Sequence, residues 1–390
     1  MVKNSIIWSI SFALAIVSAL TAIGAVSKKT MPGIAVALKP LNGFAVERLA
    51  SGLVKAAIAS NRGEVPHKIS DRLASLAKTA FYEEPLTPAA VAMLALAGPP
   101  ASDRQRLMAA AESLSRREPL ITAWMIADSK ARDDIPAILA HYDTMLRTSS
   151  TAGALILPAM GMTLTNSDFI EPMASLLKTD PPWAPQFWGT VVVLPEAIGN
   201  ASELRKRLYR AQDDKVVYRD ADLIGELVFH HQFEQAESLY RVLAGESSEV
   251  PLLTNSSFKN EPVYPPLDWQ LFSSGSYGAN IKDGNLRLSA MRNSGGLFAR
   301  QLINIPATTL QIDVQMSRAV PDQADLAIVL QCGENNNNMS REVRIKLTDS
   351  SISRTIDNRN SGCRYYWLNV TGRASDEGFD MSIESISIKI

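Results

Sequence analysis

Residue combinations that support catalysis are missing from this sequence. The four histidines form no His-x-x-x-His pair and no Cys/His cluster, so their spacing predicts no zinc site. There is no Gly-x-Ser-x-Gly elbow, Walker-type loop or Gly-x-Gly-x-x-Gly turn. Acidic stretches such as DEGFD (376–380) offer carboxylates, but such turns are commonly solvated. We therefore expect a protein that is not an enzyme and that binds no metal or cofactor.

Aromatic and amide side chains gather in the last third of the chain, and they support a different chemistry. Exposed flat rings stack on the apolar faces of sugars, and neighbouring amides provide hydrogen bonds. The candidate ligand-binding residues are Trp269, Tyr277, Tyr366, Trp367 and Asn280, with Tyr365, Asn285 and Asn358 beside them.

The alternative is that some of these rings belong to a core. Within CRYYWLNV (363–370), Tyr365 and Trp367 fall on one face of a strand and Tyr366 on the other. Core packing is the favoured interpretation for Trp269, because signature tryptophans of β-sandwiches usually pack inside. Tyr277 follows a glycine–serine loop and is less constrained.

The elements that position these residues change type along the chain. Residues 51–150 contain twenty alanines and residues 251–390 only eight, which indicates close-packed helices that give way to strands. Prolines and polar turns divide residues 44–249 into segments of one or two helices, as in helical repeats. In the first segment, a 3.6-residue period predicts one apolar face made of Phe44, Leu49, Leu53, Ala56 and Ala57.

Residues 226–245 resemble the tetratricopeptide pattern. Phe233, Ala236 and Tyr240 occupy its aromatic, small and second aromatic positions, while His231 stands where the motif has glycine. Residues 130–149 are a weaker copy, so we predict an irregular helical repeat domain. Tryptophans and a phenylalanine in PPWAPQFWG (181–189) are interpreted as packing between repeats, with a partner-binding patch as the alternative.

After residue 250 the apolar period becomes two, with strand-like stretches such as LQIDVQM (310–316) and VRIKL (343–347). Short strands between Asn/Gly/Ser turns predict a β-sandwich over residues 250–390. The stretch LLTNSSFKNEPVYPPLDWQLFSSGSYGA (252–279) is interpreted as its entry strand and first long loop. A change of phase near Glu384 and Ser385 predicts a bulge in the last strand.

Residues 5–27 carry no charge and no proline, and their length suits a transmembrane helix. A cleaved signal peptide has a shorter apolar region, and a buried helix would have a polar face, so an uncleaved anchor is favoured over both. Residues 28–43 are interpreted as a juxtamembrane linker. The charges on the two sides of this segment are too similar to predict which end faces the cytoplasm.

Two cysteines, Cys332 and Cys363, both lie in the predicted sandwich. Outside the cytoplasm they could form a disulfide, and in a reducing compartment they would be ordinary thiols. The anchor and the cysteine pair together favour an N-in protein with its bulk outside the cytoplasm. A net charge of −1 argues against nucleic acid as the main partner.

The order TNSSF (254–258), DWQL (268–271), GNLRLSA (284–290) and FDMSIESISI (379–388) resembles the jelly-roll carbohydrate-binding modules. With the anchor and the helices before it, the chain also resembles bacterial membrane-anchored tetratricopeptide-like proteins associated with exopolysaccharide export. Ser257 replaces a residue that is often acidic in those modules, and Pro306–Ala307 replaces a Pro-Gly turn, so no calcium site is carried over.

The resemblance implies a multidomain α plus β protein of the bacterial inner membrane, with its bulk in the periplasm. Its expected function is that of a non-catalytic adaptor whose helices bind protein and whose sandwich binds a glycan or another envelope component. Two alternatives remain: a structural subunit whose sandwich touches only protein, and an enzyme with a site between the domains.

Overall fold

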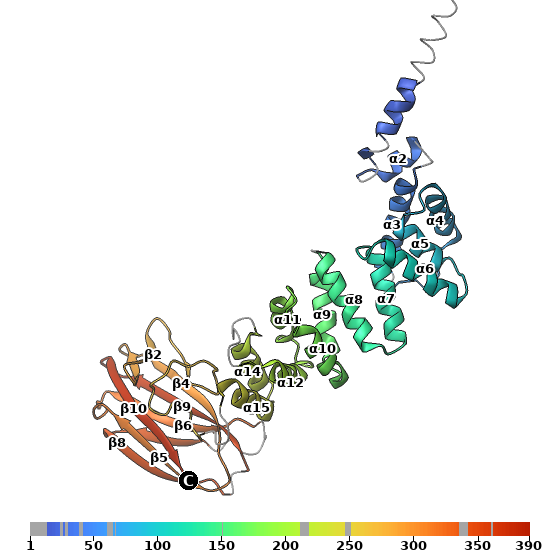
Figure 1. The fold of residues 1–390 in the computed structure, drawn as a ribbon. Coiled ribbons are helices and arrows are strands. Elements are labelled where there is room, and N and C mark those ends of the chain that lie inside the picture. Colours follow the sequence, from blue (N-terminus) through green and yellow to red (C-terminus); the bar gives the residue numbers. More distant parts are fainter. Residues whose placement is uncertain are drawn as a thin grey trace, which may run out of the picture. The chain divides into compact units, whose positions relative to one another are not determined.

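The structure is a computed structural model that describes most of the chain from residue 14 to residue 390 (Figure 1). Not described are residues 1–13, 24–25, 28–29, 39–41, 61–64, 67, 150, 211–217, 246–250, 335–341 and 360–361. Much of the predicted anchor, residues 5–27, lies outside the described residues. Among those described, the helices are too short or too polar to cross a membrane.

The chain divides into two compact units, residues 1–156 and 157–390. The first unit contains the helices α2 (Pro32–Leu38), α3 (Gly43–Ser60), α4 (Asp71–Glu83), α5 (Pro88–Leu96), α6 (Ala101–Leu114), α7 (Pro119–Ala131) and α8 (Ile135–Thr148), and residues 14–23 are helical as well. Helix α2 lies within residues 28–43, the predicted linker, and packs against α3. Helix α9 (Gly153–Thr163) spans the division.

Local signals explain where these helices begin. The side chains of Ser70 and Asp134 accept hydrogen bonds from the first turns of α4 and α8, and prolines open α5 and α7. The predicted apolar face of α3 was wrong, because Phe44 is 40% and Leu53 44% exposed. A stripe of smaller residues is buried instead, and α4 packs closely against this stripe. Its members are Ala45, Val46, Ala50 and Val54.

The second unit holds further helices and all described strands. Its helices are η1 (Ser167–Phe169), α10 (Ile170–Leu177), α11 (Ala184–Val191), α12 (Ile198–Leu208), α14 (Asp220–Phe229) and α15 (Phe233–Ala244). Trp183, Phe187 and Trp188 are buried and contact one another edge to face. This segment therefore packs inside the helical layer and does not form a surface patch.

Helices α14 and α15 form the hairpin that the tetratricopeptide-like pattern predicts. Phe233, Ala236 and Tyr240 are all buried, as the motif requires. His231 has a φ of 57° in the turn between the two helices. This left-handed conformation is the one that favours glycine, which explains why the motif has glycine there.

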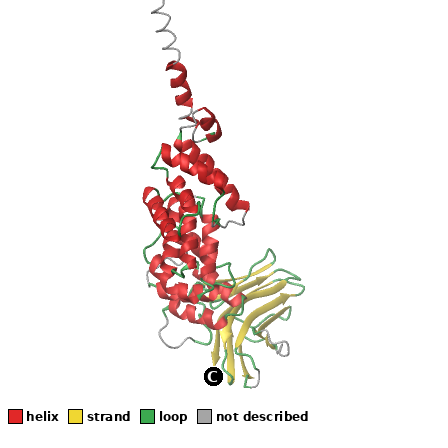
Figure 2. Cartoon of the chain, turned by 90° about the vertical axis from the view of Figure 1, so that its right-hand side faces the viewer, coloured by secondary structure: helices red, strands yellow, loops and turns green. Residues whose placement is uncertain are grey.

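The strands form two antiparallel five-stranded sheets (Figure 2). The strands are β1 (Gln270–Leu271), β2 (Tyr277–Lys282), β3 (Asn285–Ala290), β4 (Gly295–Asn304), β5 (Thr309–Met316), β6 (Ala324–Cys332), β7 (Val343–Leu347), β8 (Ser351–Asp357), β9 (Tyr365–Ala374) and β10 (Phe379–Lys389). Sheet A has the order β1-β4-β9-β6-β7, and sheet B has the order β2-β3-β10-β5-β8. The predicted sandwich is thus present.

Alternate residues of both sheets build one core between them. Leu288 and Ile312 of sheet B and Ile328 and Val370 of sheet A are among its buried members. The predicted bulge in β10 is confirmed, because the register to β5 shifts between Ile383 and Ser385.

The stretch before β1 is made of turns, and the first strand begins at Gln270. The predicted entry strand is therefore replaced by a loop. Its rings still enter the core, where Phe258 and Trp269 are fully buried with centroids 5.4 Å apart.

Candidate functional site

Sheet A presents one face to the core and one outward, and strand pairing places polar side chains on the outer face. In the register, Arg300 of β4 lies opposite Asn369 of β9, which lies opposite Val329 of β6. One pleat further, Trp367 lies opposite Gln331. Side chains from three strands that are distant in sequence therefore meet on this face, because cross-strand partners point the same way.

A hollow of about 540 Å³ lies on this outer face. Its walls come from β4, β6, β7 and β9, and the lining side chains carry both donors and acceptors, among them Arg300, Asp325, Gln331, Arg344, Asn369 and Thr371. An open hollow with converging polar groups suits a hydrated ligand better than an apolar one.

Arg300 is held at this hollow by two rings and one amide. Its guanidinium lies over the Trp367 ring at 4.2 Å and near the Phe272 ring at 5.4 Å. Its Nε donates to Oε1 of Gln270 at 2.7 Å. Partial burial lowers the pKa of Arg300, because desolvation disfavours the charged form. Trp367 thus works here as a support for a cation, since the guanidinium covers one face of its ring.

A second outward-facing hollow, of about 1160 Å³, lies on sheet B and is lined by Tyr277 and Asn280. Asn280 is exposed, but the Tyr277 ring packs edge to face on Phe298 with centroids 5.3 Å apart. The described lining is rich in serine and arginine, and its rings, Tyr277 and Phe379, belong to the core side of the sheet. This hollow therefore lacks an aromatic platform among its described residues.

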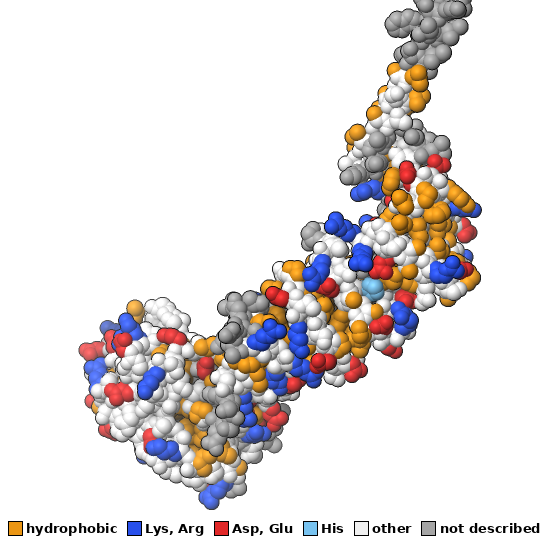
Figure 3. Space-filling view, in the orientation of Figure 1, with side chains coloured by type: hydrophobic (Ala, Val, Ile, Leu, Met, Phe, Trp, Pro, Cys, Tyr) orange, Lys and Arg blue, Asp and Glu red, His pale blue; other side chains and the backbone are white. Residues whose placement is uncertain are grey.

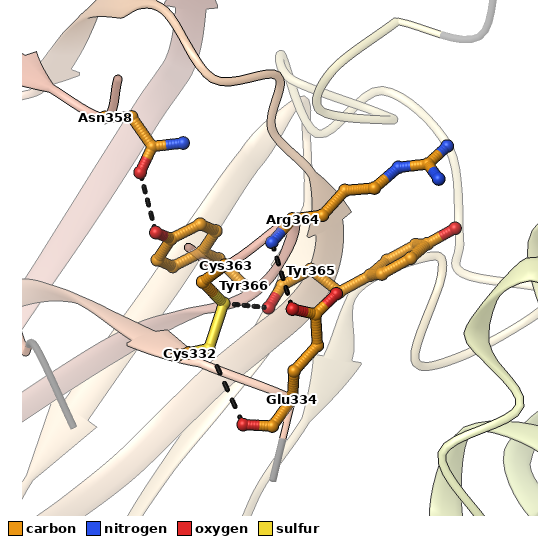
Figure 4. The surroundings of a disulfide bond; sticks show 7 residues. All are labelled: Cys332, Glu334, Asn358, Cys363, Arg364, Tyr365 and Tyr366. Carbon is orange, nitrogen blue, oxygen red and sulfur yellow. Dashed lines mark hydrogen bonds between the residues drawn. A yellow bond between two sulfur atoms is a disulfide. The ribbon is translucent and has the colours of Figure 1, made fainter. Parts of the chain in front are cut away.

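The predicted site residues do not form one cluster. Trp269 is 0% and Tyr366 5% exposed, so neither offers a ring face to a ligand. The hydroxyl of Tyr366 donates to Oδ1 of Asn358 at 2.6 Å, which explains how a buried phenol is satisfied (Figure 4). Trp367 lies on sheet A, whereas Tyr277 and Asn280 lie on sheet B.

The sequence did not single out Arg300, Gln331 or Asn369. Each stands at an outward position of its strand, but the same strands carry further polar residues such as Gln301 and Asp325, so residue type did not single the three out. What could not be seen is that β4, β6 and β9 are neighbours, because these strands are far apart along the chain.

The two cysteines are joined, with an S–S distance of 2.04 Å (Figure 4). The bond ties the end of β6 to the chain just before β9. Glu334 lies close to both sulfurs, but a disulfide leaves no thiolate to ligate a metal. Oε2 of Glu334 accepts from the backbone N–H of Arg364 at 3.3 Å.

Helix α15 packs on the end of sheet A next to this disulfide. The Tyr365 hydroxyl and the Asn304 amide both donate to Oε2 of Glu237 at 2.9 Å. The Phe233 and Tyr365 rings lie 5.1 Å apart. Arg364 forms an ion pair with Glu234 at 2.9 Å. The last helical hairpin and the sandwich are therefore held together by aromatic and charged contacts.

Glu237 gives this contact a dependence on pH. Burial raises its pKa, but hydrogen bonds from Asn304, Tyr365 and Arg241 outweigh burial and bring the pKa below its usual value. A lowered folded-state pKa stabilises the fold above the unfolded value of about 4.3, and this stability is lost as pH falls through the folded pKa.

We therefore expect Glu237→Gln to flatten the pH dependence of unfolding. Between pH 7 and pH 3, the urea midpoint of the variant should fall less than that of the native chain, because glutamine has no proton to gain. Glu234→Gln is the matched control, since the Glu234 side chain is 74% exposed. Identical pH profiles for Glu237→Gln and the native chain would contradict the assignment.

Comparisons with known proteins give weak matches only. No protein-family model matches the chain, and no curated protein does. Among solved structures, the carbohydrate-binding module TmCBM61 in complex with beta-1,4-galactotriose is 12% identical, with a TM-score of 0.25 over 36% of this chain and 99% of its own. A CBM4 carbohydrate-binding module is 14% identical, with a TM-score of 0.24 over 35% of this chain and 98% of its own.

Accessory secretory protein 1, 2 and 3 from Streptococcus pneumoniae is 13% identical over 33% of this chain and 100% of that chain, with a TM-score of 0.25. At these identities and TM-scores, the likeness to the carbohydrate-binding modules concerns the sandwich part alone. It does not show what this chain binds.

Proposed function

We propose that this protein is a non-catalytic adaptor whose sandwich binds a polysaccharide and whose helices bind a protein partner. The observation that carries the proposal is the polar hollow on the outer face of sheet A, with the stacked pair Arg300–Trp367 beside it. Sugars are bound by planar arrays of hydrogen-bonding side chains next to rings, and this face supplies both.

Trp367→Ala should weaken polysaccharide binding by the full-length chain about tenfold, because Arg300 loses the ring that orients it, a loss of roughly 1.4 kcal/mol. Trp367→Phe should retain most of the affinity. Affinity electrophoresis or titration against neutral and acidic polysaccharides provides the measurement.

Tyr82→Ala is the matched control, because Tyr82 is a 71% exposed aromatic in the first unit. Its affinity should equal that of the native chain. If Trp367→Ala binds as tightly as the native chain while unfolding at the same urea concentration, sheet A is not the glycan site.

The proposed protein partner would bind the helices of the first unit. Large hydrophobic side chains are exposed there, among them Phe44, Leu53, Tyr82 and Leu86. Figure 3 shows hydrophobic atoms gathered on the visible face of this unit. We further propose an N-terminal anchor at residues 5–27 and a periplasmic location in a polysaccharide export system. The apolar segment and the disulfide support this location, because disulfides persist in oxidising compartments.

The second candidate function is a structural subunit whose sandwich contacts only protein. It is favoured by the way α15 already binds one end of sheet A through Glu237 and Phe233. Failure of the native chain to bind any polysaccharide, together with a partner that cross-links to β4 or β9, would support this candidate instead.

A further inference from the structure

The charge of Arg300 is not neutralised by a carboxylate in the described part of the chain. Gln270 accepts from Nε, but none of the described residues accepts a hydrogen bond from the two terminal nitrogens. An ion pair on this face joins Arg344 to Asp325 at 2.8 Å and does not include Arg300. A half-buried arginine without a counter-ion is costly unless a ligand supplies the missing charge.

The geometry of Arg300 suits one kind of ligand group. The contact with the Trp367 ring and the bond from Nε to Gln270 together restrict the orientation of the guanidinium. The terminal N–H groups then form a fork that matches the two oxygens of a carboxylate. Because the stacked rings hold the fork in place, little side-chain entropy is lost on binding.

The other charged groups on this face add to the same potential. Arg373 lines the hollow and is exposed, and Lys346 of β7 is exposed at an outward position of the register. Among the described residues that line the hollow, the acidic groups are Asp325, which Arg344 pairs, and Glu342. The cations therefore outnumber the acids, which favours an anion over a neutral sugar.

We propose that the hollow on sheet A binds an acidic glycan, with Arg300 taking a carboxylate of the uronic acid type. This inference rests on the proposed function and narrows it from polysaccharides in general to anionic ones.

The test compares polymers that differ only in charge. The native full-length chain is titrated with polygalacturonate and alginate, with the methyl ester of each, and with poly-L-glutamate as a polyanion without sugar. The variants are Arg300→Gln, which removes the charge, and Arg300→Lys, which keeps the charge but loses the fork. Arg287→Gln is the matched control, because Arg287 is a strand arginine of sheet B that pairs with Asp283.

We expect the native chain to bind at least one of the two acids at least tenfold more tightly than its methyl ester. Arg300→Gln should abolish this difference, Arg300→Lys should retain part of it, and Arg287→Gln should leave it unchanged. The comparison of acid with ester needs no variant, so it stays decisive even if Arg300→Gln fails to fold.

Equal affinity for acid and ester would overturn the inference and leave the glycan proposal standing. Poly-L-glutamate bound as tightly as the acidic polysaccharides would overturn the inference, since the ligand would be any polyanion. Binding to neither the acids nor their esters would overturn the inference, and failure to bind the neutral polysaccharides as well would overturn the proposed function. Loss of the difference in Arg287→Gln, and not in Arg300→Gln, would move the site to sheet B.

Discussion

Asp220→Ala is expected to lower the free energy of unfolding of the second unit by about 3–5 kcal/mol. Asp220 and Arg205 form an ion pair at 2.8 Å in which both side chains are completely buried. Removing the carboxylate takes a hydrogen-bonded anion away from a buried guanidinium, so less of the desolvation cost of that charge is offset. Urea unfolding followed by tryptophan fluorescence measures the loss. Trp188 reports locally, because its ring packs on Tyr218, over which the Arg205 guanidinium lies.

The double variant Arg205→Met/Asp220→Leu should recover most of this stability, because it removes both charges and keeps apolar volume in the core. Arg106→Ala is the control for an exposed pair, since Arg106 and Asp103 are 84% and 51% exposed and should contribute less than about 1 kcal/mol. If the double variant is less stable than Asp220→Ala, the charge itself is not the source of the loss.

Removal of the disulfide should have the next largest effect. Cys332 and Cys363 are 31 residues apart, and closing a loop of that length restricts the unfolded chain by about 3–4 kcal/mol. We expect Cys332→Ala/Cys363→Ala to unfold at a lower urea concentration by this amount. The contact of α15 should weaken as well, because Arg364 and Tyr365 directly follow the bonded Cys363.

Reductant provides the control for this prediction. In dithiothreitol, the native chain should unfold at the same urea concentration as the double variant. Reductant should not change the urea concentration at which the double variant unfolds. Alkylation of free thiols during extraction from cells also tests the proposed location. If both cysteines resist alkylation because they are bonded, an oxidising compartment is supported. Complete alkylation of both would contradict that location.

The order of helices and strands could be predicted from the sequence. The period of apolar residues changes from 3.6 to two along the chain, and the phase shift near Ser385 marked the bulge that the register of β10 shows. Local patterns also located the α14–α15 hairpin, whose turn places His231 in the left-handed region. Such features depend on neighbours a few residues apart, so the sequence expresses them directly.

It was harder to predict which face of each helix or strand is buried. In α3, small residues pack against α4 while Phe44 remains exposed, because close approach of two helices selects Ala and Val over large rings. Trp269 and Tyr366 had the chemistry of a sugar platform, but their burial removes them from the surface. Residue type alone does not tell a packed ring from an exposed one.

By itself, the sequence determined that the chain combines helices with strands, and approximately where the helices give way to the strands. It also contains no recognisable catalytic motif. Only the tertiary structure decided which side chains meet. Arg300, Asn369 and Gln331 share one face because β4, β9 and β6 are paired, and Glu237 reaches Tyr365 because α15 packs on that sheet. Strand pairing over tens of residues follows from burial of the whole core, and no local pattern encodes it.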